Sequence, residues 1–490
     1  MRLLLGTSLT VALAALGCGG SEKASDTPAP APARPERPAR PEPMRSPRDE
    51  AFLQEVEQRT FHWFWETTNA ENGLVPDRWP TKSFSSVAAV GFGLTAYPIG
   101  IERGFITREE GRQRAKVTLE FFLNAPQGKD SAGMTGYKGF FYHFLDMKTG
   151  ARYAQVELST IDTALFLAGA LTCAQYFDRD DPDEAAIRAA ADALYRRAEW
   201  DWAVVRPPLV SMAWTPEQGF GGWDYRGYNE AMLLYVLALG SPTHPIRPIA
   251  WRNYTTTYRW DSFAGGEEHV NFGPLFGHQY SHVWIDFRGI QDAYMRLKEI
   301  DYFENSRRAT LSQQLHAIAN PRGWAGWGAR DWGLSACDGP YDGKLPVNGE
   351  TREFWTYAAR GISAREQRDD GTLTPTAVAA SIPFAPEVCI PTLQHLAVLA
   401  PGDLYTEYGF VDAFNPAWQW DSPRPKMGKL VPGKGWFDTD YLGIDQGPIL
   451  AMIENHRSEL IWRLMRKNPH VVEGLRRAAF GGGWLDAPPG

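Results

Sequence analysis

The sequence predicts an all-α protein whose paired helices close into a single toroid. Apolar residues recur at helical spacing in many segments, whereas the strict alternation that is typical of half-buried strands is scarce. Gly/Trp-rich segments separate these helices, at residues 219–230, 320–340 and 426–448. Long loops without regular structure inside a compact domain are usually functional. We therefore expect these aromatic loops to form a cleft at one end of the toroid.

The expected helices follow one another along most of the chain. In order they are residues 50–67, 84–100, 107–123, 159–177, 183–204, 228–240, 280–298, 302–318, 386–399, 441–456 and 458–479. Thr107 is the expected N-cap of the third helix, because a threonine hydroxyl can accept a hydrogen bond from the first turn. Pro469 is expected to break the last segment, because proline disrupts a helix interior.

The N-terminal segment predicts export. Residues 1–18 contain Arg2, an apolar run and a small residue before a cysteine, as in a signal peptide. Residues 15–18 (Ala-Leu-Gly-Cys) resemble a bacterial lipoprotein box, so we expect Cys18 to be lipidated and the protein to lie in the cell envelope, with plain secretion as the alternative. Residues 19–47, rich in Pro and Ala, predict a disordered tether. A single globular domain is then expected at residues 48–485.

Composition excludes some partners and favours one kind of site. The 50 Lys+Arg against 58 Asp+Glu leave a net charge of −8, so binding to a nucleic acid backbone is not expected. The 19 tryptophans predict aromatic walls suited to the apolar faces of sugar rings, with a Trp-rich core as the alternative. Beyond Cys18, the cysteines are Cys173, Cys337 and Cys389, whose spacing fits neither a zinc site nor a disulfide framework.

Acidic residues next to apolar helices are the candidate catalytic groups. Glu157 and Asp162 flank the expected start of one helix, where Ser159 or Thr160 could be the N-cap, and Glu230 immediately precedes another apolar run. Asp445 also adjoins a helix start. The helix dipole favours an acid in a first turn, so a purely structural role for Asp162 is the competing interpretation.

Two acids in different protonation states would suit glycoside hydrolysis. One carboxyl must donate a proton to the departing sugar oxygen, and the other must be ionised to activate water or attack directly. Apolar surroundings raise a carboxyl pKa, whereas hydrogen bonds to the charged form lower it. We expect Glu230 to be the general acid and Glu157 or Asp162 to be the base. The acids that compete for the second role are Asp338, Asp440 and Asp445.

Several longer segments resemble a known family. They include Gly-Tyr-Asn-Glu-Ala-Met (227–232), the run 276–289 from Phe-Gly-His-Gln to Phe-Arg-Gly, Trp-Gly-Leu-Ser-Ala-Cys-Asp-Gly-Pro (332–340) and Ile-Asp-Gln-Gly-Pro (444–448). Together they resemble the bacterial glucoamylase-like family, which includes the endo-β-1,2-glucanases of glycoside hydrolase family 144 and a module of cyclic β-1,2-glucan synthases. The resemblance covers about residues 50–480. It implies a single (α/α)6 toroid without metal or organic cofactor, and it places Glu157, Asp162, Glu230 and an acid of the 440–445 loop along the cleft.

Further side chains are candidates for binding the glucan. Aromatic rings can stack on sugar rings, and polar side chains can hydrogen-bond hydroxyl groups. The same side chains also stabilise junctions between helices and loops, which is the alternative role for each. His278 and His282 could ligate a metal together, but a hydrogen-bonding role is favoured. The candidates for stacking are Trp223, Tyr228, Trp284 and Trp332, and those for polar contacts are His244, His278, Gln279, Arg288 and Asp338.

The expected activity is therefore hydrolysis of a β-glucan, most specifically as an endo-β-1,2-glucanase. Two alternatives remain open from the sequence. A transglycosylase on β-1,2-glucan would use the same fold, and a non-catalytic surface lipoprotein could bind glycans without cleaving them. A glucan polysaccharide or oligosaccharide is the expected partner, and membrane contact is expected only through a lipid on Cys18.

Overall fold

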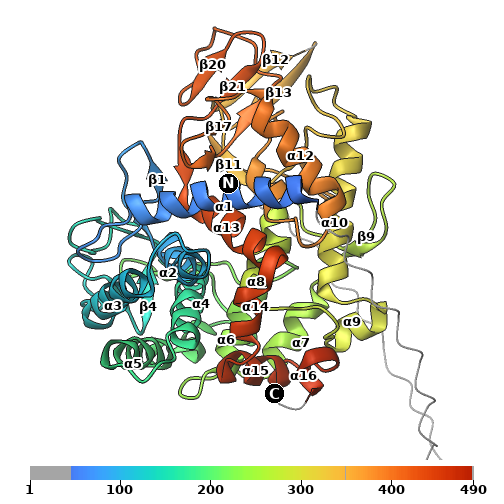
Figure 1. Cartoon of the computed structure of the whole chain (residues 1–490). Coiled ribbons are helices and arrows are strands. Elements are labelled where there is room, and N and C mark those ends of the chain that lie inside the picture. Colours follow the sequence, from blue (N-terminus) through green and yellow to red (C-terminus); the bar gives the residue numbers. More distant parts are fainter. Residues whose placement is uncertain (1–45, 348, 488–490) are drawn as a thin grey trace, which may run out of the picture. The chain divides into compact units, whose positions relative to one another are not determined.

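A ring of helices forms the centre of the computed structural model, which describes residues 46–347 and 349–487 (Figure 1). Each ring helix contacts the next, and the last returns to the first. The helices are apolar on nearly all sides, as helices enclosed by neighbours must be. In ring order they are α2 (Val87–Glu102), α4 (Thr160–Tyr176), α6 (Met232–Gly240), α8 (Tyr280–Trp284), α11 (Pro375–Ala379) and α13 (Gly443–Ser458).

Other helices cover this ring from outside and at one end. Helices such as α1, α3 and α5 bury one face and expose charged residues on the other. The remaining helices of the described chain are α1 (Pro47–Thr67), α3 (Arg108–Asn124), α5 (Pro182–Arg197), α7 (Ile249–Thr256), α9 (Ala293–Lys298), α10 (Tyr302–Ala319), α12 (Pro386–Leu399), α14 (Leu460–Met465), α15 (Pro469–Arg477) and α16 (Gly483–Asp486), with 3-10 turns η1 (Trp200–Ala203) and η2 (Leu275–His278).

Glycines let the ring helices approach closely. A Cβ atom added to Gly169 on α4 would lie 2.1 Å from the carbonyl oxygen of Gly91 on α2, and one added to Gly91 would lie 2.3 Å from the carbonyl oxygen of Leu165. Real Cβ atoms do not approach backbone so closely. The two helices therefore pack backbone against backbone, which fixes how their N-terminal ends are placed.

The helix predictions succeed where local signals are strong. Thr107 is confirmed as the N-cap of α3, in a capping box with Glu110, and Pro469 does separate α14 from α15. The prediction of one helix over residues 280–298 is wrong, because the chain leaves the helical conformation at Ile285 and resumes at Ala293. Helices α7 and α11 were not expected.

Short strands accompany the helices, so a purely helical description is too simple. The largest sheet has the order β3-β4-β6-β7-β8, all antiparallel. The strands are β1 (Arg78–Trp79), β2 (Ser85–Ser86), β3 (Gly136–Tyr137), β4 (Phe140–Tyr142), β5 (Phe144–Leu145), β6 (Leu158–Ser159), β7 (Ala213–Thr215), β8 (Gly219–Phe220), β9 (Trp260–Asp261), β10 (His269–Val270), β11 (Ala336–Asp338), β12 (Gly343–Val347), β13 (Glu350–Phe354), β14 (Tyr357–Ala359), β15 (Gly361–Ile362), β16 (Gln367–Arg368), β17 (Tyr405–Thr406), β18 (Gly409–Phe410), β19 (Phe414–Asn415), β20 (Lys429–Val431), β21 (Gly435–Phe437) and β22 (Tyr441–Leu442).

Strands join the N-terminal ends of the ring helices. Strand β6 runs into α4, and β22, which runs into α13, pairs with β1 shortly before α2. Strands β11, β12, β13, β20 and β21 gather at the top of the view in Figure 1, on the side opposite α15 and α16. Residues placed just before these helices are thus brought to one end of the ring.

The other expectations about chain organisation have mixed outcomes. The expected signal peptide, its Cys18 and nearly all of the tether lie outside the described residues. Cys173, Cys337 and Cys389 are buried free thiols, in agreement with the prediction of no disulfide framework. None of the helices in residues 46–347 and 349–487 has both the length and the apolar character that a membrane crossing requires.

Candidate active site

Candidate acids meet at the N-terminal ends of the ring helices. Asp162 lies in the first turn of α4, where Ser159 is the N-cap and accepts a hydrogen bond from the Asp162 amide. Asp445 lies in the first turn of α13, and Glu230 lies two residues before α6. The charge of Asp162 raises the pKa of Glu230, so the two carboxyls are close enough to interact. Three of the expected catalytic residues thus share one end of the ring.

Glu157 joins this group through His143. Strands β4 and β6 pair with Phe141 opposite Ser159 and Tyr142 opposite Leu158, so the antiparallel register places His143 opposite Glu157. The His143 Nδ1 atom lies 2.8 Å from Glu157 Oε1, and its Nε2 atom lies 3.7 Å from Asp162 Oδ1. This hydrogen bond lowers the pKa of Glu157 against the opposing effect of partial burial. Glu157 is therefore ionised at neutral pH.

Glu230 has the opposite protonation behaviour. Burial, together with the negative charge of Asp162, raises the pKa of Glu230 to about 7. The residue is not sealed in the core, because part of its surface remains exposed to solvent. Its own backbone carbonyl accepts a hydrogen bond from the Ser281 hydroxyl, 2.8 Å away, which ties it to the start of α8. Glu230 can therefore hold a proton near neutral pH and release it to a bound molecule.

A second acidic group lies at the same end, around Asp338, Asp412 and Asp438. One carboxylate oxygen from each lies within 4.8 Å of the others, and all three residues are buried. Arg78 binds Asp338 at 2.7 Å, whereas Asp412 Oδ1 and Asp438 Oδ2 have no hydrogen-bond partner in the described chain. Burial and the neighbouring carboxyls raise the pKa of Asp412 and of Asp438 well above the usual range. Such a trio can share protons, and its spacing could also hold a divalent cation.

Asp445 connects the second group to Glu230. Burial, with the charges of Asp338 and Asp77, raises the pKa of Asp445 to about 8. Tyr280, at the start of α8, is near acids of both groups, since its pKa is raised by burial and then by both Asp445 and Glu230. Asp77 in turn influences His143. The two groups of acids are therefore close enough to influence one another electrostatically.

Several residues of this site were not found from the sequence. Tyr357 stands opposite Asp338 in the β11–β14 pair and is 50% exposed, so its ring is available to stack on a sugar. Neither Asp412, in the segment Tyr-Gly-Phe-Val-Asp-Ala-Phe-Asn at residues 408–415, nor His143 adjoins the start of an expected helix. The residues that the sequence did not identify are Asp77, Arg78, His143, Tyr280, Tyr357, Asp412 and Asp438.

The structure contradicts three of the four predicted stacking residues. Trp284 and Trp332 are fully buried, and their indole N–H groups donate to Thr95 and Thr392. Tyr228 is 1% exposed and packs among aromatic rings. More than half of the 19 tryptophans are buried, so the alternative of a Trp-rich core accounts for most of them. Trp223 is 78% exposed, and its role in binding stays a prediction.

The predicted polar contacts are corrected as well. His278 and Gln279 are buried, and the Gln279 amide donates to Ala377 and Ser381 at 2.8 Å each, which joins α8 to α11. His244 follows the C-terminus of α6, about 13 Å along that helix from Glu230. Arg288 lies beyond the other end of α8, bound to Asp286 and Glu459. His278, Gln279 and Arg288 therefore have structural contacts, and His244 lies away from Glu230. Asp338 is at the site, but Arg78 engages its carboxylate.

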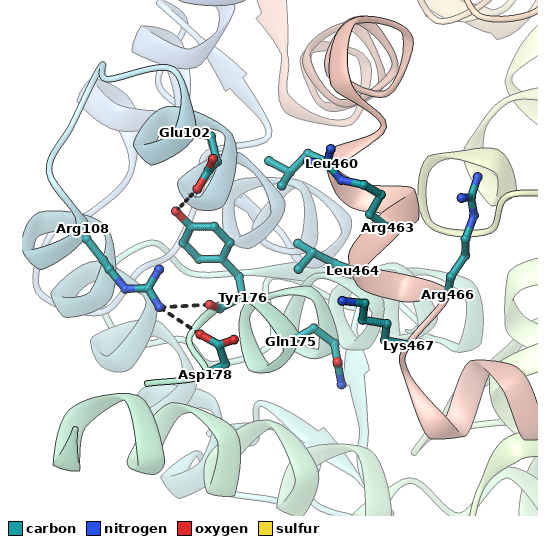
Figure 2. Close-up of a pocket in the computed structure, with 10 residues that line it drawn as sticks. All are labelled: Glu102, Arg108, Gln175, Tyr176, Asp178, Leu460, Arg463, Leu464, Arg466 and Lys467. Atoms are coloured by element: carbon teal, nitrogen blue, oxygen red, sulfur yellow. Dashed lines mark hydrogen bonds and ion pairs between the residues drawn. The ribbon is translucent and has the colours of Figure 1, made fainter. Parts of the chain in front are cut away.

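Two hollows in the described surface are lined by other residues than the predicted catalytic acids. Figure 2 shows one of about 470 Å³ between α4 and α14, lined by Tyr176, Arg463 and Lys467 among others. Tyr176 ends α4, whereas Asp162 begins it, so this hollow is at the opposite end of the ring. The other, of about 720 Å³, lies along β13 and β16 beside Trp355 and Arg368. None of the four predicted catalytic acids lines either hollow.

The fold and the site together define a class of protein: a helical toroid with carboxyl groups of opposite protonation at the N-terminal ends of its inner helices. Residues 222–469 match the model of a family described as "Glycoamylase: Putative glucoamylase". The chain belongs to this glucoamylase-like family.

Individual relatives are similar to this protein over most of the chain. An "Exo beta-1,2-glucooligosaccharide sophorohydrolase (non-reducing end)" of Parabacteroides distasonis is 30% identical in an alignment of 462 positions that covers 88% of this chain, and this chain spans 58% of that relative's length. The structure resembles an endo-beta-1,2-glucanase from Chitinophaga pinensis, in complex with sophorotriose and glucose, with a TM-score of 0.75 and 28% identity over 89% of this chain and 99% of that one. A "putative glucoamylase" from Bacteroides uniformis is similar, with a TM-score of 0.74 and 32% identity over 91% and 100%.

Proposed function

We propose that this protein is a glycoside hydrolase that cleaves β-1,2-linked glucan by acid/base catalysis. The observation that carries the proposal is the contrast between Glu230, whose pKa is raised to about 7, and Glu157, whose pKa is lowered, within one site. Cleavage of a glycosidic bond needs one carboxyl of each kind. The named activities of the relatives supply the linkage, since both the Parabacteroides and the Chitinophaga proteins are described as acting on β-1,2-glucans or their oligosaccharides.

In this mechanism Glu230 donates its proton to the oxygen of the departing sugar. Glu157 or Asp162, both beside the cationic His143, accepts a proton from the attacking water. The exposed ring of Tyr357 packs against a sugar ring. We also assign the toroid to the (α/α)6 type, with the ring helices as its inner set. The chain's endo action is proposed by analogy with the Chitinophaga enzyme.

The experiment is to incubate the purified protein with linear β-1,2-, β-1,3-, β-1,4- and β-1,6-glucans and to measure new reducing ends and product lengths. We expect new reducing ends with β-1,2-glucan alone, and early products of mixed length for endo action. Release of a disaccharide from the start would indicate exo action. Redistributed chain lengths or rings without new reducing ends would identify a transglycosylase, and binding without any chain shortening would overturn the catalytic proposal.

Export as a lipoprotein remains a proposal, supported by the order of charged, apolar and small residues before Cys18. We expect cells that express the full chain to place the protein in the membrane fraction, with a lipid on Cys18. The Cys18→Ser variant is expected to lose the lipid and the membrane association. Unchanged fractionation and mass of this variant would contradict a lipid anchor at Cys18.

A further inference from the structure

His143 occupies a central position among the acids although it belongs to neither group. It extends from the end of β4, and its ring stacks on Phe144 with centroids 4.0 Å apart. Both ring nitrogens face carboxylates, Nδ1 towards Glu157 at 2.8 Å and Nε2 towards Asp162 at 3.7 Å. A neutral imidazole carries only one N–H, so it cannot donate to both carboxylates at once, whereas an imidazolium can.

The charges around His143 favour that imidazolium. Asp162 from α4, Glu157 from the chain before β6 and Asp77 from the chain before β1 all act on it. Burial alone would lower the pKa of His143, but the two carboxylates and Asp77 together raise it to about 9. The histidine therefore stays positively charged across the neutral range, and it is the counter-ion of two candidate catalytic acids.

The other acids of the site lie in a different charge environment from Glu157 and Asp162. Glu230 has no ion-pair partner among the described residues, and the second group has Arg78, which contacts Asp338 at 2.7 Å and Asp440 at 3.7 Å. The positive charge of His143 is thus placed so that Glu157 remains ionised. Glu230, without one, can keep a proton near neutral pH.

We propose that His143 is a positioning residue, whose imidazolium holds Glu157 in the ionised state and keeps Glu157 and Asp162 in fixed orientation, and so leaves the transferable proton to another carboxyl of the site. This inference rests on the proposed glycoside hydrolase function. It adds a residue that acts on the reaction through its neighbours, without touching the reacting atoms.

The first test follows the imidazole itself and needs no enzymatic activity. With ¹³C-labelled histidine, the resonance that disappears in the His143→Asn variant is assigned to His143, and its chemical shift is followed with pH. We expect a midpoint near 9, and a lower midpoint in the Glu157→Gln variant, which lacks the negative charge. A midpoint at or below 6.5, the usual value for histidine, would overturn the proposal even if the protein proves to be an active glucanase.

The second test separates the charge of His143 from its hydrogen bond. Asparagine can still donate to Glu157 but is neutral, so we expect His143→Asn to lower kcat by about tenfold or more while KM changes little. The acidic limb of the pH–rate profile should move to higher pH, because Glu157 loses the cation that favours its ionised form. The matched control is His395→Asn, which removes a surface histidine bound to Asp331 at 3.2 Å and should leave the profile unchanged.

The outcomes of this pair of variants distinguish the possible failures. A folded His143→Asn protein with the pH profile and kcat of the wild type would overturn the positioning role. If the wild type cleaves no glucan, the proposed function fails, and the imidazole titration still decides whether His143 is the counter-ion of Glu157 and Asp162. Thermal unfolding of each variant shows whether any loss of activity comes from loss of the fold.

Discussion

The Glu230→Gln variant is expected to lose about 10²- to 10⁴-fold in kcat/KM on β-1,2-glucan, the contribution usual for a general acid. Glutamine has the shape of glutamic acid but cannot donate the proton that the departing sugar oxygen needs. KM should change much less than kcat, because the amide can still make hydrogen bonds to the substrate. Initial rates of reducing-end formation at several substrate concentrations measure both quantities.

The control for this variant is Glu473→Gln, at an exposed position on α15. It makes the same chemical change outside the site and should keep full activity. Thermal unfolding should show that Glu230→Gln folds as the wild type does, and that its stability does not fall, since glutamine avoids burying a charge. Near-normal turnover by a folded Glu230→Gln protein would exclude Glu230 as the proton donor.

The Arg360→Met variant is expected to have the largest effect on stability, a decrease of about 3–5 kcal/mol in the free energy of unfolding. Arg360 is completely buried and binds both oxygens of Asp370 at 2.8 Å. It also donates to the carbonyl oxygens of Cys337 and Trp355. Its removal leaves the Asp370 carboxylate buried without a counter-ion. Unfolding in urea, followed by circular dichroism, measures the change.

A double variant separates the lost pair from the uncompensated charge. Asp370→Asn removes the negative charge and keeps one oxygen, which can accept one of the two backbone hydrogen bonds that the carboxylate oxygens now accept from Trp355 and Thr372. The double variant Arg360→Met/Asp370→Asn should therefore be more stable than the sum of the two single changes implies. Arg360 holds the carbonyl oxygen of Cys337, the residue before Asp338 of the candidate site. The Arg360→Met variant should therefore also lose activity. A loss of less than about 1 kcal/mol in Arg360→Met would contradict the importance assigned to this pair.

Local features of the fold could be predicted from the sequence. Helix starts at Thr107 and Ser159 follow from side chains that accept hydrogen bonds within one turn, and such contacts need no knowledge of the rest of the chain. For the same reason Asp162, Glu230 and Asp445 were recognised, since each lies beside the start of an apolar helix. The ring then brings these starts to one end.

The other site residues depend on contacts between distant segments. His143 meets Glu157 only because β4 and β6 pair in one register, and Arg78 reaches Asp338 across 260 positions of sequence. Trp284 and Trp332 were misassigned because their N–H groups find hydroxyl partners inside the core, in Thr95 and Thr392. An aromatic residue in a glycine-rich loop has the same local pattern whether it faces solvent or the interior.

The pH dependence of kcat/KM for the wild type on β-1,2-glucan tests the central claim most directly. Glu230 must be protonated to act, and its pKa is raised to about 7, so activity should be present below that pH and fall as the pH rises through about 7. Ionised Glu157, with its lowered pKa, should sustain activity down to mildly acidic pH. A kcat/KM that stays constant from about pH 6 to pH 9 would contradict proton donation by a carboxyl of this kind.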